Sequence, residues 1–198
     1  MRVLTILVPA LLVLAGCAGG AKNVSEPTFY LLRSVARAPE GLQKPPVDVG
    51  INRVTVADYL GQQGLVVATS SGQVRPARQH LWAESLDSSI RLFLQDAISV
   101  ALGYPVSADS GRRRSWQYLV DIRIDQWHGY LDGEARILAS WVLIDVARDR
   151  VLSRHSFEQN GALKADGYDA LVEAQTDLLD ALAGAVADSL KKDIVGAM

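Results

Sequence analysis

The sequence predicts a single α+β domain, in which two amphipathic helices pack on one face of a mixed, largely antiparallel β-sheet. Residues 86–102 and 168–194 carry apolar side chains at helical spacing. Between them, residues 118–158 alternate apolar and polar side chains in three segments joined by short turns. Strands joined by short turns pair antiparallel, and an amphipathic helix buries its apolar stripe. This order of elements is typical of an α+β fold.

The first strands are expected in the N-terminal half of the domain. Residues 29–32 are short, aromatic and apolar, and predict a strand. Residues 47–56 alternate as a half-buried strand does, and Gly50 within them leaves room for a bulge or a close backbone approach. The intervening 36–46 holds three prolines and a glycine, which predicts a loop. Residues 65–75 predict a tight hairpin.

The first helix is predicted over 86–102. Its apolar residues fall on one continuous face: Leu86, Ile90, Phe93, Leu94, Ala97, Ile98 and Ala101. Ser85 is a favoured residue type for the cap at its start. Gly103 is well placed to end it, because glycine readily adopts the left-handed conformation found after helices.

The most regular part of the chain is a predicted three-strand meander. The first strand covers 118–125, and Asp132-Gly133 predicts a two-residue hairpin whose central positions both have positive φ. The return strand covers 135–143. Residues 147–150 then turn the chain into a third strand over 151–158.

The second helix is predicted over 168–194. Its buried stripe consists of Tyr168, Leu171, Leu178, Leu179, Leu182, Ala185, Val186 and Leu190. Asp166 and Asp169 favour the helix start, and Lys191-Lys192 complement the dipole near its end. We see no internal repeat in the chain.

The N-terminus carries an export signal. Arg2 precedes an apolar stretch over 3–13 that is too short to span a bilayer, as in secretory signal peptides. The following Leu14-Ala15-Gly16-Cys17 resembles the lipobox of bacterial lipoproteins, in which the cysteine is acylated and becomes the mature N-terminus. The resemblance implies a signal peptide over 1–16, a lipidated Cys17 with a flexible tether over 17–27, and one periplasmic domain over 28–198. The alternative is an ordinary signal peptide whose cleavage site lies beside a cysteine.

Composition narrows the classes of function. Hydrophobic residues make up 49% of the 198 residues, enough to bury a core. The formal net charge of −2 leaves no basic excess to bind nucleic acid. With one cysteine in the chain, no internal disulfide can form, so the fold depends on packing alone.

Neither an enzyme nor a metal site is indicated. His80, His128 and His155 lie far apart and lack metal-ligand spacing, and no Gly-x-Ser-x-Gly motif marks a nucleophile. We therefore expect no catalytic residue, no metal and no cofactor beyond a covalent lipid such as palmitate on Cys17. The basic triplet Arg112-Arg113-Arg114 is interpreted as a solvated loop, with phosphate or lipid-headgroup binding as the alternative.

Three segments together resemble the PqiC-like family, the auxiliary lipoproteins of ABC-type transport systems that work with MCE-domain proteins. They are residues 29–32, the Val-Gly-x-x-x-Val…Tyr-Leu segment over 49–60, and Trp-Ala-Glu-x-Leu over 82–86. The family often has proline where this chain has Ala57 and Ser85. It also has an Asp/Arg-Pro-Gln run where this chain has glycine and glutamine after Leu60.

This resemblance implies a periplasm-facing, outer-membrane-anchored component of a system that transports lipids or hydrophobic compounds between membranes. Its partners would be an MCE-domain protein, an inner-membrane component and further copies of itself. Ala18 agrees with the outer membrane, because an aspartate after the acylated cysteine is the usual inner-membrane retention signal. The domain would then act as a docking module.

Aromatic residues near turns, which we expect to be exposed, are the candidate partner contacts. Trp82 is expected to open the first helix, and Trp127 and Tyr130 to flank the first meander hairpin. For each, ordinary core or sheet packing is the competing explanation. Two other functions stay open: direct lipid carriage in an apolar groove between helices and sheet, and, less favoured, an envelope enzyme.

Overall fold

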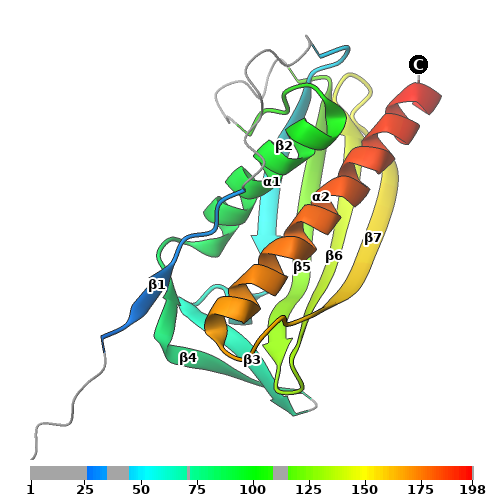
Figure 1. Ribbon diagram of the computed structural model, residues 1–198. Helices are drawn as coiled ribbons and strands as arrows, with labels where there is room; N and C mark the ends of the chain where they lie inside the picture. Colours follow the sequence, from blue (N-terminus) through cyan, green and yellow to red (C-terminus); the bar gives the residue numbers. More distant parts are fainter. Residues whose placement is uncertain (1–25, 35–44, 71, 109–115, 198) are drawn as a thin grey trace, which may run out of the picture.

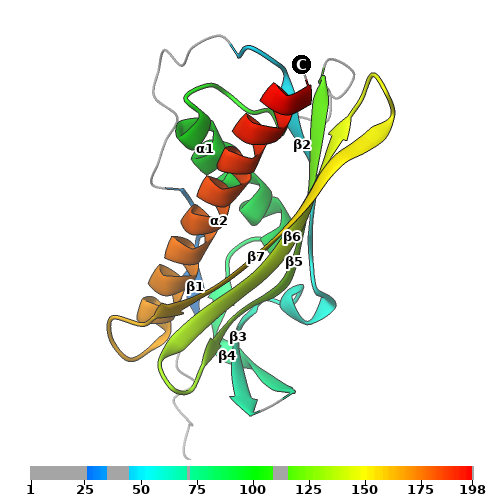
Figure 2. The same ribbon diagram turned by 90° about the vertical axis from the view of Figure 1, so that its right-hand side faces the viewer.

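The computed structural model describes residues 26–34, 45–70, 72–108 and 116–197. It confirms the α+β prediction: a seven-stranded mixed sheet carries two helices, and both lie on the same face (Figure 1; Figure 2). The predicted signal peptide, Cys17, most of the predicted tether and the arginine triplet lie outside the described residues. Within the described part of the chain, no helix is both long and apolar enough to cross a membrane.

The elements follow one another along the chain in alternating groups of strands and helices. They are β1 (Thr28–Tyr30), β2 (Val49–Val56), the 3-10 helix η2 (Asp58–Leu60), β3 (Gly64–Ser70), β4 (Gln73–Trp82), α1 (Leu86–Leu102), β5 (Tyr118–Tyr130), β6 (Glu134–Asp145), β7 (Arg150–Ala162) and α2 (Tyr168–Ala197). The sheet order is β1-β4-β3-β5-β6-β7, and β2 also pairs with β5.

The meander β5-β6-β7 is confirmed as an antiparallel unit. Its first turn differs from the one expected, because Gly133 has φ 84° while Asp132 keeps a negative φ. The Gly133 N–H donates to the Tyr130 carbonyl at 3.4 Å, so the turn has three residues and ends in a left-handed glycine. A two-residue turn with positive φ at both positions would strain the aspartate, and the longer turn avoids this.

β5 is the central strand of the sheet. One of its edges pairs with β6, and the other is shared by two strands that run parallel to it. β2 pairs with residues 118–124 of β5, and β3 pairs with residues 129–130. η2 lies between β2 and β3 in sequence, on the side of the sheet away from the helices (Figure 2).

β4 is longer than predicted, and its length shows that the predicted position of Trp82 was wrong. It continues to Trp82, so this tryptophan ends a strand and does not open the first helix. β1 runs parallel to β4 at the sheet edge, with Tyr30 opposite Trp82. The extra length of β4 gives β1 its partner.

The helices agree closely with the sequence pattern. α1 has the predicted bounds, and Gly103 ends it in the left-handed conformation with φ 79°. Ser85 is the residue before α1, but its hydroxyl makes no capping hydrogen bond. α1 packs on β2, and α2 packs on β6. α2 covers a row of buried β6 side chains: Ala135, Ile137, Ala139, Trp141 and Leu143. The core therefore lies between the sheet and the two helices. Neither α1 nor α2 lies on the opposite face of the sheet.

Candidate functional site

The N-terminal strand β1 is fastened to the body of the domain through Tyr30. The Tyr30 hydroxyl donates to Asp169 Oδ1 at 2.7 Å and lies 2.9 Å from His80 Nδ1. A hydroxyl has one proton to donate, so the His80 Nδ1–H donates to Tyr30. Burial and then the Asp169 carboxylate raise the pKa of Tyr30 to about 12, which keeps the hydroxyl protonated. Tyr30 thus joins β1 to β4 and to the start of α2.

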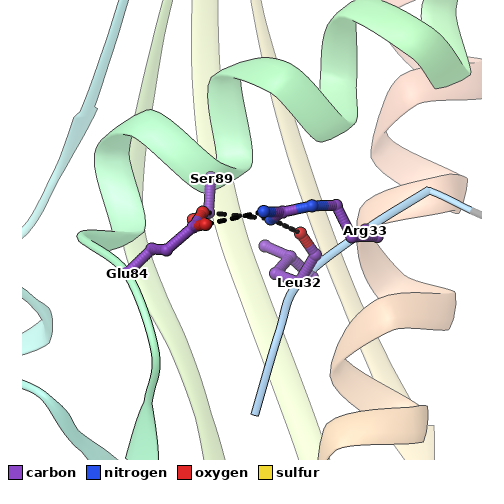
Figure 3. Close-up of polar contacts among 4 residues, drawn as sticks. All are labelled: Leu32, Arg33, Glu84 and Ser89. Atoms are coloured by element: carbon purple, nitrogen blue, oxygen red, sulfur yellow. Dashed lines mark hydrogen bonds and ion pairs between the residues drawn. The ribbon is translucent and has the colours of Figure 1, made fainter.

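A second contact follows directly after β1 (Figure 3). The Arg33 guanidinium donates to both Glu84 oxygens, at 3.0 and 2.6 Å, and to the Leu32 carbonyl at 2.8 Å. Ser89 on α1 donates to the same carboxylate at 3.1 Å. The hydrogen bond from Arg33 lowers the pKa of Glu84. We call Tyr30, Arg33, Glu84 and Asp169 the β1 clasp.

Two of the three candidate contact residues are buried. Trp82 and Trp127 are 3% and 1% exposed and stack on each other, with ring centroids 5.2 Å apart. The Trp127 Nε1–H donates to the Gln175 carbonyl of α2 at 3.1 Å. The expectation that these rings are exposed is wrong, and the competing explanation, core packing, describes both.

Tyr130 lies elsewhere, on the open face of the sheet, where it is half-buried. It joins a group that sequence reasoning did not assemble. His128 packs against Tyr130 with ring centroids 5.1 Å apart, and its Nδ1 lies 2.8 Å from the Tyr59 hydroxyl. Burial, and to a lesser degree the Arg136 charge, lowers the pKa of His128. Burial raises the pKa of Tyr59 to about 12.

This aromatic group lines a hollow of about 770 Å³, which we call the open-face hollow. η2 contributes Tyr59, the β3–β4 hairpin contributes Ala68 and Val74, and the β5–β6 turn contributes Leu131. The β3–β4 hairpin and the β5–β6 turn, which line the hollow, lie at the end of the sheet where α2 begins, and the C-terminus lies at the opposite end (Figure 1; Figure 2).

A second polar group lies on the helix side, between β7 and α2. Asp193 Oδ2 accepts from the Ser153 hydroxyl at 2.6 Å and lies 2.7 Å from His155 Nε2. Burial raises the pKa of Asp193, but the hydrogen bonds from Ser153 and His155 outweigh it and the net shift is downward. The serine bonds to the carboxylate and not to the histidine, so this is a contact that ties α2 to β7 rather than a nucleophile–base pair.

The histidines also stay apart in space. His80 stacks on Tyr168 at a centroid distance of 4.0 Å, while His128 and His155 lie in the two groups above. Among the residues that the structure describes, no three His, Cys, Asp or Glu side chains are grouped as metal ligands.

Comparison with known proteins assigns the family. Residues 30–187, from the Tyr30 of the clasp into the last turns of α2, match the ABC-type transport auxiliary lipoprotein component family. The chain belongs to this family. It is a family of transport components, and the chain is a lipoprotein component of that kind.

Curated relatives agree with this assignment. The chain is 28% identical over 185 residues to the intermembrane transport lipoprotein PqiC of Escherichia coli K12, covering 92% of this chain and 95% of the relative. PqiC of Shigella flexneri matches equally well. The resemblance inferred from the three sequence segments is therefore confirmed.

Solved structures share the fold. A crystal structure of an uncharacterized protein has a TM-score of 0.71 at 24% identity, covering 84% of this chain and 99% of that one. A protein from Xanthomonas campestris has a TM-score of 0.67 at 13% identity, covering 80% and 92%. At this identity the two structures support the architecture and no particular site.

Proposed function

We propose that this chain is an outer-membrane lipoprotein, acylated at Cys17, that docks an MCE-domain transport assembly on the periplasmic side. The observation that carries the proposal is the family match over residues 30–187, which includes every element from β2 to most of α2. The curated relatives are named as intermembrane transport lipoproteins, and their length is covered almost completely. The inner-membrane component of such a system would be a further, indirect partner.

The β1 clasp supports a docking role for the domain. Cys17 precedes Thr28 by eleven positions, so the intervening chain spans at most about 40 Å even when fully extended. Tyr30 and Arg33 hold β1 to β4, α1 and α2. The limit of about 40 Å therefore applies to the distance between Cys17 and the folded domain. A lipid on Cys17 would therefore keep the whole domain close to one membrane surface. Two or more acyl chains make such attachment stable.

Tyr130 remains the candidate contact with the partner. Its neighbour Leu131 is 67% exposed at the apex of the β5–β6 turn, which makes this turn accessible. We expect a photo-crosslinking amino acid at Leu131, in cells, to capture the MCE-domain protein. The matched position is Val146 in the β6–β7 turn at the other end of β6, which is also exposed. Failure to recover an MCE-domain protein from either position would refute the docking role.

The lipid anchor has its own test. Mass spectrometry of the mature protein should show a diacylglyceryl-modified, N-acylated N-terminal Cys17, and separation of the membranes should place the protein in the outer-membrane fraction. A Cys17→Ala variant should leave that fraction. A mature protein that lacks the lipid mass would contradict this part of the proposal and leave the crosslinking result to be judged independently.

A further inference from the structure

The open-face hollow has the size and construction of a ligand site. Its volume of about 770 Å³ lies within the range of small-molecule pockets, roughly 300–1,000 Å³. It is lined by η2, the β3–β4 hairpin and the β5–β6 turn. η2 lies on the sheet face opposite α1 and α2 (Figure 2). The groove that the alternative of direct lipid carriage would need between helices and sheet, in contrast, is occupied by buried side chains of both layers, such as Ile137, Leu179 and Leu182. A ligand would therefore bind on the opposite side of the sheet.

The charged groups that line the hollow itself are acidic. Its lining includes two carboxylates, Asp125 and Asp132, and contains no lysine or arginine. Two basic side chains lie just outside the lining: Arg123 pairs with Asp125 at 2.6 Å, and Arg136 lies close to His128. Because the pKa of His128 is lowered, its imidazole adds no positive charge near neutral pH. A free anion would meet two carboxylates and no lysine or arginine in this lining.

The polar and aromatic groups of the lining fit an ammonium group in particular. Gln126 lines the hollow, and its buried Oε1 accepts no hydrogen bond within the described part of the chain. The terminal torsion of glutamine is soft, so a small rotation brings this acceptor to a ligand donor. Tyr59 and Tyr130 supply two aromatic rings, whose faces attract cations. A primary ammonium group can use both features, because it donates hydrogen bonds and carries charge.

Two exposed side chains of the lining are apolar, beside polar ones such as Gln73 and Asp132. Val74 and Leu131 are 42% and 67% exposed, and Ala68 lies beside them in the wall. Among the described residues, Val74 and Leu131 leave much of their apolar surface uncovered. They suit a ligand whose charged end enters the hollow and whose hydrocarbon continues along the rim.

We propose that the open-face hollow binds the ammonium headgroup of an aminophospholipid, of the phosphatidylethanolamine type, with its acyl chains over Val74 and Leu131. The proposal rests on the transport function inferred above and names the class of lipid that the domain itself would hold. The two proposals fail in different experiments. Absence of lipid binding would not change the crosslinking result at Leu131, and absence of that crosslink would not prevent the measurement of lipid binding.

Native mass spectrometry of the full-length protein, purified from membranes in detergent, tests the proposal directly. Phosphatidylethanolamine and phosphatidylglycerol with the same acyl chains are titrated, and the bound fraction of each is read from the mass increment. We expect the dissociation constant for phosphatidylethanolamine to be lower by about tenfold, the size expected for a hydrogen bond to a charged group. Equal binding of the two lipids would overturn the proposal.

Two variants locate the site. Gln126→Leu removes the unpaired acceptor and Tyr130→Leu removes one aromatic ring, and each should abolish most of the preference for phosphatidylethanolamine. As a control, Gln159→Leu makes the same glutamine-to-leucine substitution at an exposed β7 position outside the hollow. This variant should keep the preference for phosphatidylethanolamine. Circular dichroism confirms that the variants fold. A preference that survives both hollow variants would show that the lipid binds elsewhere and refute the assignment.

Two further measurements separate the lipid from other sources of an ammonium group. Phosphoethanolamine without acyl chains should bind far more weakly than the lipid, because it makes no contact with the rim. A photo-crosslinking residue at Gln73, which lines the hollow, should capture phosphatidylethanolamine in cells. Equal binding of phosphoethanolamine, or capture of a protein alone at Gln73, would refute a lipid ligand.

Discussion

The two faces of the sheet are built from the same strands but differ in what covers them. On the helix-covered face, alternate residues of β6 are buried under α2, and Trp127 bonds to the backbone of α2. On the open face the intervening residues, such as Arg136 and Leu138, are only half-buried, and the open-face hollow forms beside them. Strand alternation places consecutive residues on opposite faces, so Trp127 and His128 have opposite roles. Stability should depend on the covered face and binding on the open one.

The largest expected effect on this comparison comes from Trp127→Ala. The change deletes a ring that stacks on Trp82 and leaves the Gln175 carbonyl without its donor. We expect the free energy of unfolding to fall by about 3–5 kcal/mol. Urea denaturation followed by circular dichroism measures it. Leu131→Ala on the open side should change it by less than about 0.5 kcal/mol, and a similar loss from both variants would contradict the comparison.

A smaller effect on stability is expected from adding a methyl group where β5 packs against α2. A Cβ on Gly129 would lie 2.7 Å from Leu171 Cδ1, so Gly129→Ala should destabilise the domain by about 1–3 kcal/mol. The same substitution at Gly184, in α2 with open space around it, should stabilise by about 0.5–1 kcal/mol. Thermal melts of the two variants should therefore shift in opposite directions. Shifts of the same sign would show that α2 does not pack on β5 in this way.

The open face should control part of the pH dependence of stability. Burial lowers the pKa of His128 in the folded state, so the unfolded chain binds a proton that the folded chain does not. The free energy of unfolding should therefore be fully retained above the ordinary histidine pKa of about 6.5 and fall as the pH drops below it. Denaturant titrations at about pH 7.5 and about pH 5.5 should show a smaller difference for His128→Gln than for the wild type. An unchanged difference would mean that His128 does not titrate in this way.

The smallest expected effect concerns the β1 clasp at the sheet edge. Arg33→Ala removes an exposed ion pair, which contributes little to global stability. We expect no measurable change in the urea midpoint, but faster hydrogen exchange at the Ala83 amide, which donates to the Tyr30 carbonyl. Lys164→Ala, which removes another exposed ion pair, is the control and should leave this amide unchanged. Equal exchange rates in both variants would show that Arg33 does not hold β1.

Local patterns in the sequence were sufficient for most of the fold. The bounds of α1 follow from its apolar spacing and from Gly103, and the meander follows from period-two alternation. The parallel pairing of β2 and β3 with β5 could not be predicted, because partners such as Val49 and Tyr118 are far apart in sequence. The type of the β5–β6 turn was also missed, since Asp-Gly occurs in two-residue and three-residue turns alike.

The candidate site was harder to predict than the fold. An aromatic residue near a turn gives no sign of its face, and Trp127 and Tyr130 lie on opposite faces of one strand. A bulge between Ile124 and Gln126 shifts the alternation of β5 side chains between the two sheet faces, just before Trp127 and Tyr130. No pattern in the sequence revealed this bulge. Tyr59, Gln126 and His128 come together only after η2 and β5 are placed. Their signal in the sequence is limited to residue type.

The parallel strands β2 and β3 have a consequence for the order of folding. Their partner β5 begins at Tyr118, so during synthesis or export from the N-terminus the first half of the sheet has no central strand to pair with. The hairpins of the meander close through short turns, whereas β2 must close a loop of nearly seventy residues at a higher entropic cost. The chain should therefore stay unfolded until β5 emerges and then fold around it, a delay that would suit the export predicted from the N-terminal sequence.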